Sequence, residues 1–168
     1  MTAADFVMLA GAVVLGVPMI VTDLREHRLP NRLTGAAALV VLATALVAAV
    51  LGSGWGRWPG MLLTGLGMAL GGYLLAVVAD GAFGMGDVKL LGVVGLALGH
   101  LEPSTVVVWL LALAVASALW LLLVPVLDKA ADRTVAWRKR HIAFGPPIIV
   151  AWWLVYVVMI TASLGRGA

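Results

Sequence analysis

The sequence contains no cysteine and few charged residues. With no cysteine among its 168 residues, the chain has no disulfide, no thiol nucleophile and no cysteine-ligated metal centre. Charged residues make up 11% of the chain, against about 25% in a soluble domain. Hydrophobic residues make up 63% and the mean hydropathy is +1.11. This composition predicts an all-α membrane protein whose core is surrounded by a lipid bilayer.

Long apolar runs predict the membrane-spanning helices, each of which needs about 20 residues. Five runs meet or approach this length: Phe6–Val21, Leu33–Leu51, Met61–Ala79, Val106–Leu127 and Ile142–Leu164. The first run lacks a basic region before it, so we interpret it as a span rather than a cleavable signal. A further piece, Leu90–Leu98, is too short alone. It becomes long enough if it begins near Ala82 and ends near Leu101.

The placement of basic residues indicates that this sixth piece crosses the membrane. With six crossings, one side receives nine basic residues and the other receives two. The nine are Arg25, Arg28, Arg32, Lys89, Lys129, Arg133, Arg138, Lys139 and Arg140, and the two are Arg57 and Arg166. Without that crossing the asymmetry is lost. The positive-inside rule therefore predicts six transmembrane helices with both termini outside the cytoplasm. It also explains the net charge of +3 without a nucleic-acid partner.

Asp23 and Asp87 are the candidate catalytic residues. Asp23 closes the first apolar run, where it could instead be a solvated carboxylate paired with Arg25 or Arg28. Asp87 lies at the start of the sixth segment, and an ionisable residue within a span costs about 2.5–3.5 kcal/mol, which favours a functional role. An ion pair of Asp87 with Lys89 is the structural alternative, but residues two apart on a helix point in different directions.

The predicted topology places both aspartates at cytoplasmic helix ends. Two carboxylates that share one proton can hydrolyse a peptide bond, one taking a proton from water and the other polarising the carbonyl. Near Asp87, Gly84 and Gly86 permit backbone conformations closed to other residues and leave room for an extended peptide. The sequence does not show whether the first and fourth helices touch.

Three segments resemble the motifs of one enzyme family. Gly84–Lys89 (Gly-Met-Gly-Asp-Val-Lys) is similar to the Gly-x-Gly-Asp-x-Lys signature of the prepilin peptidases, or type IV leader peptidases, a branch of the GxGD membrane aspartyl proteases. Asp23 followed by Leu29-Pro30-Asn31 resembles their first motif. Ile142–Pro146 resembles their Pro-Phe-Gly-Pro stretch, with Ala143 in place of the first proline.

The resemblance implies a function and a set of site residues. It implies an aspartic endopeptidase that removes the short basic leader of a prepilin-like precursor at the cytoplasmic face of the cell membrane, with Asp23 and Asp87 as the catalytic pair. Gly84 and Gly86 would shape the site, and Lys89 is a motif residue without an assigned role. Pro30 and Asn31 would fix the turn after the first helix, because proline lacks an N–H and asparagine bonds local backbone. No metal or cofactor is expected.

The chain is expected to form a single transmembrane peptidase domain over residues 1–168. Longer family members carry an N-terminal cytoplasmic domain, often with paired cysteines, that is linked to methylation of the product. Only about twenty residues precede Asp23, which resembles the short, peptidase-only form found with Flp (tight-adherence) pili and archaeal preflagellin processing. We therefore expect cleavage without methylation.

Several alternatives remain open at this stage. Asp80 could replace Asp23 as the first catalytic aspartate, although a helix-terminus role is favoured. The chain could instead be a small proton-coupled transporter using Asp87 and Lys89, or a non-catalytic assembly factor of a pilus or secretion system. The histidines, His27, His100 and His141, form no convincing metal site, and His100 is interpreted as an interfacial residue. Two G-x-x-x-G pairs, Gly67/Gly71 and Gly95/Gly99, could bring helices close together.

Overall fold

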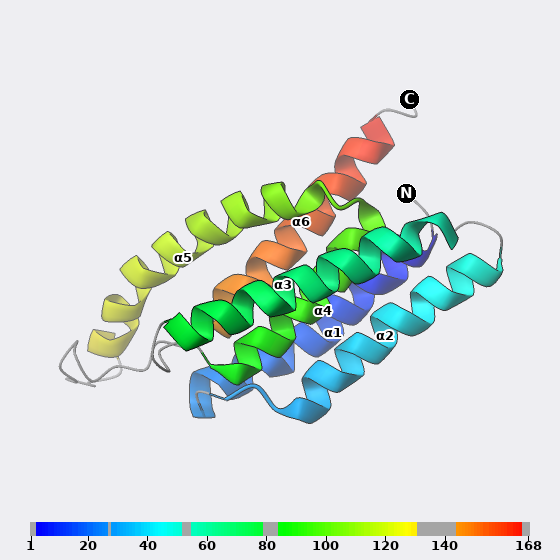
Figure 1. The fold of residues 1–168 in the computed structure, drawn as a ribbon. Helices are drawn as coiled ribbons and strands as arrows, with labels where there is room; N and C mark the ends of the chain where they lie inside the picture. Colours follow the sequence, from blue (N-terminus) through cyan, green and yellow to red (C-terminus); the bar gives the residue numbers. More distant parts are fainter. Residues whose placement is uncertain (1–2, 27, 52–54, 79–83, 131–143, 166–168) are drawn as a thin grey trace.

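The computed structural model describes residues 3–26, 28–51, 55–78, 84–130 and 144–165. These residues form helices connected in a bundle whose two termini lie at the same end (Figure 1). The elements are α1 (Ala3–Glu26), α2 (Asn31–Val50), the short 3-10 helix η1 (Trp55–Arg57), α3 (Trp58–Val78), α4 (Met85–Leu101), α5 (Thr105–Ala130) and α6 (Gly145–Gly165). The prediction of an all-helical fold is confirmed.

Each predicted apolar segment corresponds to one helix, with shifted ends. The first helix continues beyond the apolar run to Glu26, so that Asp23 lies inside its last turn. No proline or glycine interrupts the chain there, and Arg25 complements the negative end of the helix dipole. A turn at Glu102–Ser104 connects α4 to α5, with the Thr105 N–H bonded to the Glu102 carbonyl at 2.9 Å.

Five of the helices are long and apolar enough to cross a membrane, which makes the chain a multi-pass membrane protein. The exception is α4, which has 17 residues and is therefore about 25 Å long. It runs between the same two ends of the bundle as its neighbours (Figure 1). The sixth crossing remains a prediction.

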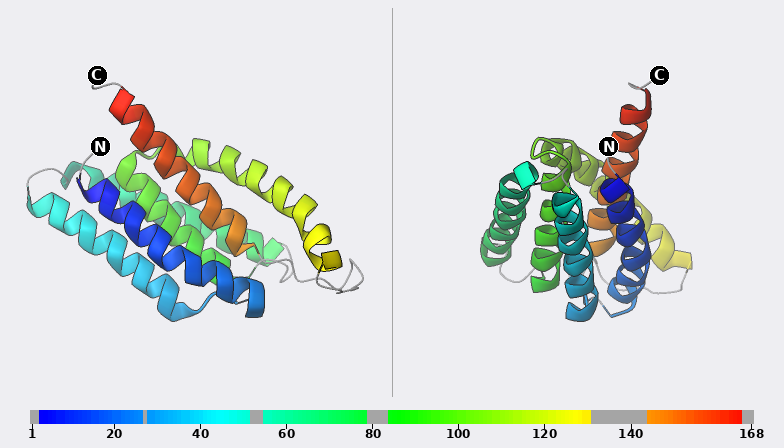
Figure 2. Two further views of the ribbon diagram at one scale, coloured as in Figure 1. Left: turned by 180° about the vertical axis from the view of Figure 1, so that it is seen from behind. Right: turned by 90° about the vertical axis from the view of Figure 1, so that its right-hand side faces the viewer.

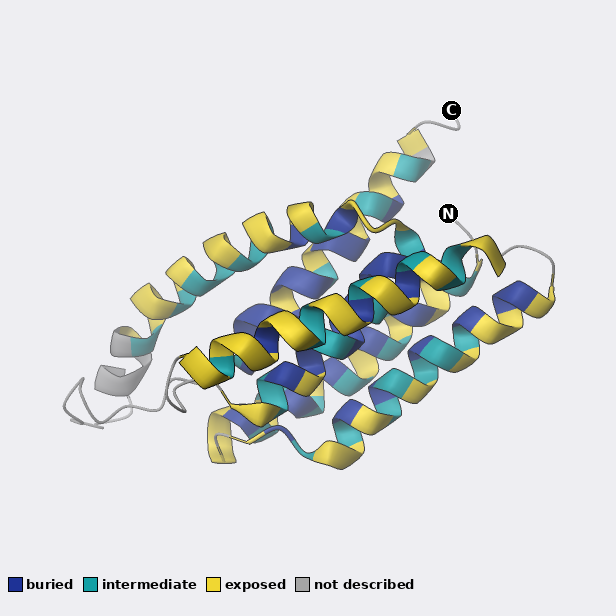
Figure 3. Cartoon of the chain, viewed as in Figure 1, coloured by how far each residue is buried: buried dark blue, intermediate teal, exposed yellow. Residues whose placement is uncertain are grey.

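Helix α4 lies in the middle of the bundle, which means that a helix shorter than its neighbours is surrounded by protein. It packs against α2, α3, α5 and α6, and the views in Figure 2 show helices on several sides of it. Ten of its residues are buried, whereas α3 and α5 expose long apolar faces (Figure 3). Its side chains therefore contact protein more than lipid, so α4 depends less on having the full length of a lipid-exposed membrane span.

Glycines set the distance between α3 and α4. A Cβ added at Gly95 would lie 2.7 Å from the Thr64 carbonyl oxygen, and one at Gly99 would lie 2.7 Å from the Met61 Cα. Any larger residue would push the two backbones apart, so this G-x-x-x-G pair is confirmed as a contact. Gly67 and Gly71 have no atom of the described residues within 4 Å of an added Cβ, and that pair makes no such contact.

A buried polar cluster joins the helices at the end where the chain begins. Asp5 is 1% exposed, and its Oδ1 lies 3.7 Å from His100 Nε2 and 3.8 Å from Arg57 Nη1. The Tyr156 hydroxyl donates to the Ala97 carbonyl at 2.9 Å. The interpretation of His100 as an interfacial residue was wrong, because its side chain is 1% exposed and lies beside Asp5 of α1. No role for Asp5 was predicted from the sequence.

We expect Asp5→Asn to destabilise the protein. It removes the negative charge beside His100 and Arg57, and breaking a buried ion pair costs about 3–5 kcal/mol. Because the Arg57 side chain is 36% exposed, we expect a smaller loss, about 2–3 kcal/mol. Equilibrium unfolding in detergent measures it. Glu102→Gln, which neutralises an exposed carboxylate at the same end of the bundle, is the control. Equal stability of the two variants would show that the cluster contributes nothing.

Candidate active site

Asp23 and Asp87 lie at the end of the bundle opposite the termini. Asp23 is in the last turn of α1 and is 5% exposed. Asp87 is in the first turn of α4 and is half-buried. Their carboxylates are close enough for their charges to interact. The structure thus brings together the two aspartates that the sequence could only place on the same side of a membrane.

Asp23 accepts a hydrogen bond from the start of α6. The Gly145 N–H donates to its Oδ2 at 2.9 Å, across 122 positions of sequence. The first N–H groups of a helix have no partner within the helix, and Pro146 and Pro147 have none to offer. The carboxylate of Asp23 therefore accepts from an N–H that has no partner within α6, and it lies at the positive end of the helix dipole.

Gly145 must be glycine for this contact to form. A Cβ at this position would lie 2.6 Å from the Asp23 Oδ2 and 3.1 Å from its Cγ. The sequence analysis matched this glycine to a family motif and gave it no role. The structure describes Phe144–Pro146 of that motif, and Ile142 and Ala143 lie outside the described residues.

The first turn of α4 packs against the α1–α2 connection. A Cβ at Gly86 would lie 3.0 Å from the Leu29 Cβ, so a larger side chain would displace this connection. Gly84 caps the helix with φ −75° and ψ 145°, a conformation open to any residue. The expectation that Gly84 supplies an unusual backbone conformation was therefore wrong. It instead leaves space beside Asp87, whose Oδ2 is 3.4 Å from an added Cβ.

Lys89 and Asn31 join the first two motifs. The Lys89 ammonium donates to the Asn31 Oδ1 at 2.8 Å, which gives Lys89 the position that the sequence left unassigned. Asn31 was expected to bond local backbone, and its side-chain oxygen instead accepts from α4. Pro30 precedes α2, and its carbonyl accepts from the Leu33 and Thr34 N–H groups at 3.0 and 3.2 Å. Pro30 is thus the N-cap of α2, and its role in fixing the turn remains a prediction.

Other candidate residues give no second site in the described part of the chain. Asp80, the alternative first aspartate, lies outside the described residues, as do His27 and His141. Among residues that are described, no group of three or more His, Cys, Asp or Glu side chains could hold a metal ion.

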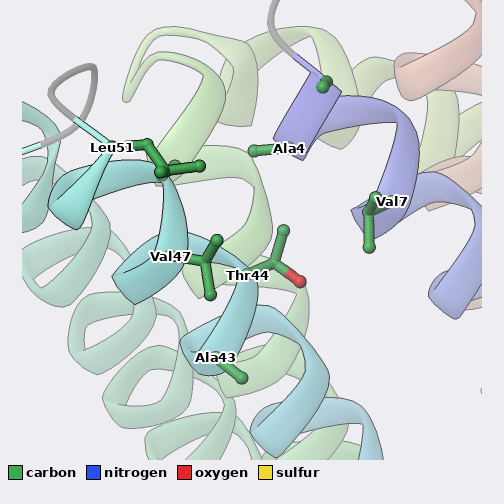
Figure 4. A pocket seen from close by; sticks show the side chains of 8 residues that line it. Ala4, Val7, Ala43, Thr44, Val47 and Leu51 are labelled. Carbon is green, nitrogen blue, oxygen red and sulfur yellow. The ribbon is translucent and has the colours of Figure 1, made fainter.

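Two cavities flank α2. One, of about 350 Å³, lies between α2 and α4 and begins at Asn31 and Lys89. The other, also about 350 Å³, lies between α1 and α2 at the far end. Around it lie Ala4 and Val7 of α1, Thr44 and Val47 of α2, and Leu51, which follows α2 (Figure 4). Only the first cavity reaches the end of the bundle that carries the aspartates.

Comparison with known families identifies the family of the chain. Residues 7–126 match the sequence profile of the type IV leader peptidase family. The match covers most of the chain and includes both aspartates, and the chain therefore belongs to this family of peptidases. Searches of curated proteins and of solved structures each found no significant match.

We expect Gly145→Ala to damage the site more than the fold. The added methyl group occupies the position of the Asp23 carboxylate, so Asp23 must move away from Asp87 or lose its hydrogen bond. Cleavage of a pilin-like precursor in detergent should fall at least about ten-fold, since one lost hydrogen bond to a charged group is worth about 1.5–3 kcal/mol. Gly165→Ala, at the other end of α6 with no atom within 4 Å of the added Cβ, is the control. Equal activity of the two variants would contradict the proposed contact.

Proposed function

We propose that the protein is an aspartic endopeptidase that removes the short basic leader of prepilin-like precursors at the cytoplasmic face of the cell membrane. The observation that carries the proposal is the meeting of Asp23 and Asp87 at one end of a membrane bundle, in a chain of the type IV leader peptidase family. The Gly145 N–H and the Lys89–Asn31 hydrogen bond support the pair from the adjoining helices.

The environments of the two carboxylates favour different roles. Asp23 accepts an N–H at the start of α6, and a donor at a helix N-terminus stabilises a negative charge. Asp87 is half-buried beside this charge, and two neighbouring carboxylates do not both ionise easily. We therefore assign Asp23 as the ionised general base and Asp87 as the protonated acid of the resting pair.

Hydrolysis then follows from this arrangement. Asp23 takes a proton from a water molecule whose oxygen attacks the scissile carbonyl, while Asp87 polarises that carbonyl. The tetrahedral intermediate collapses as the C–N bond breaks and the leaving amine receives a proton from the pair. The products are the free leader and a mature protein with a new N-terminus. No metal or covalent intermediate is required.

The membrane orientation is part of the proposal. Arg25, Arg28, Arg32 and Lys89 lie at the aspartate end of the bundle, and Arg57 lies at the other. This distribution, with α4 as the sixth crossing, supports a cytoplasmic site and extracytoplasmic termini. The short basic leader of a precursor would then lie beside the aspartates while the apolar helix of the precursor is still in the bilayer.

We expect Asp23→Asn and Asp87→Asn each to abolish cleavage. Asparagine preserves the size of aspartate but neither takes nor gives the catalytic proton, and we expect at least a 10³-fold loss of kcat/KM, within the range of about 10²–10⁴ for one acid–base group. A pilin-like precursor is incubated with each variant in detergent, and thermal melts check the fold.

Two further variants make the result specific. Glu26→Gln removes an exposed carboxylate one turn from Asp23 and should retain near-normal activity. Asp80→Asn should also remain active. Activity in either dyad variant would refute the pair, and loss in Asp80→Asn with Asp23→Asn active would identify Asp80 as the first aspartate. Unchanged activity of every variant would favour contamination by another peptidase or a non-catalytic role.

The topology has its own test, made simple by the absence of natural cysteine. Single cysteines replace Ser53, Ser104 and Thr134, and intact cells are treated with an impermeant thiol reagent. Ser53→Cys and Ser104→Cys should be labelled, and Thr134→Cys only after the cells are broken. Labelling of Thr134→Cys alone on intact cells would reverse the orientation.

A further inference from the structure

The cavity between α2 and α4 is a groove that begins beside the aspartates. Its walls are Asn31, Gly35 and Ala38 of α2 and Lys89, Gly92 and Leu96 of α4. Both helices start at the aspartate end and run in the same direction. The matching positions, 31 to 38 and 89 to 96, cover two turns, about 10 Å along each helix. The groove is therefore a straight channel parallel to the helices.

The groove is polar only where it meets the site. Asn31 and Lys89 form its mouth, joined by their hydrogen bond of 2.8 Å, and beyond them most of the lining is small or apolar. Thr34 is the exception, but its hydroxyl bonds the Pro30 and Asn31 carbonyls. An occupant would thus have a polar end beside the aspartates and an apolar body leading away from them.

The outer side of the groove is open. Gly35 is exposed, and no atom of the described residues lies within 4 Å of a Cβ built on it. Of its two walls, α4 packs closely on α3, while α2 makes its main contacts with α1 and α4. An apolar helix could therefore enter sideways from the bilayer, and the small residues Gly35 and Ala38 would let its backbone approach.

We propose that this groove holds the apolar helix of the precursor, parallel to α2 and α4, during cleavage. The inference rests on the proposed function. A precursor whose leader is cytoplasmic and whose helix crosses outward runs in the same direction as α2 and α4. Its leader then emerges at the mouth of the groove, where Lys89 is only two residues from Asp87, about 3 Å along the helix axis.

The geometry also fixes where the peptide bond must lie. Lys89 and Asp87 are on different faces of α4, because residues two apart on a helix do not share a face. The segment before the substrate helix must therefore cross the first turn of α4, where exposed Gly84 carries no side chain. The scissile bond therefore lies in an extended segment that precedes the substrate helix and leads from the groove to the aspartates.

Crosslinking tests occupancy without requiring cleavage. A photoreactive benzophenone side chain replaces Gly35 in the Asp87→Asn background, in nanodiscs with a precursor built from a basic leader, a glycine and an apolar helix. We expect a crosslink to the apolar helix of the precursor. The matched control is the same replacement of Gly67, an exposed glycine of α3 that also has no atom within 4 Å of an added Cβ. Equal crosslinking at both positions, or crosslinks to lipid alone, would contradict the proposal that the groove holds the apolar helix of the precursor.

Kinetics separate the groove from the carboxylates. Gly35→Leu fills the groove and should raise KM for the full precursor at least ten-fold, with kcat within two-fold of wild type. Gly67→Leu should change neither. Wild-type cleavage with an unaffected Gly35→Leu variant would reject the groove and leave the peptidase assignment intact. Absence of cleavage by the wild type would reject the peptidase assignment, and crosslinking would still report on the groove.

Discussion

The close packing of α3 on α4 is the constraint on which the rest of the molecule depends. Gly95 and Gly99 leave no room for a side chain against Thr64 and Met61, so α4 is held in the middle of the bundle. A central helix meets protein on several sides and can be shorter than its neighbours. Its first turn then lies among the ends of α1, α2 and α6. This position brings Asp87, which lies in that turn, close to Asp23 of α1.

The two ends of the bundle use charged groups for different purposes. At one end Asp5 and His100 are buried and Arg57 lies beside Asp5 with its side chain partly exposed, and their interaction supports the packing. At the other end Asp23 is buried against a backbone N–H, and Asp87 is half-buried beside it. The second arrangement keeps one carboxylate within reach of solvent. Access to water is a requirement of the proposed hydrolytic role of this pair.

The three family motifs acquire physical roles from one another. Gly86 accommodates Leu29, Lys89 binds Asn31, and Gly145 both bonds Asp23 and makes room for it. None of these contacts is local in sequence, which is why the sequence left Lys89 and Gly145 without roles. Gly84 has an ordinary backbone conformation, and its contribution is the space that it leaves beside Asp87.

The sequence by itself determined the helices, their order and the candidate aspartates, because apolar runs of membrane length and an ionisable residue within one of them are local signals. Helix ends were less well predicted, since α1 continues past the apolar run and past Asp23 to Glu26. Only the tertiary structure decided which helix is central, which glycine pair makes a contact, and that His100 is buried. It also placed Asp23 against Gly145. These features depend on side chains more than a hundred positions apart in some cases, and no periodicity along the chain specifies which helix faces meet.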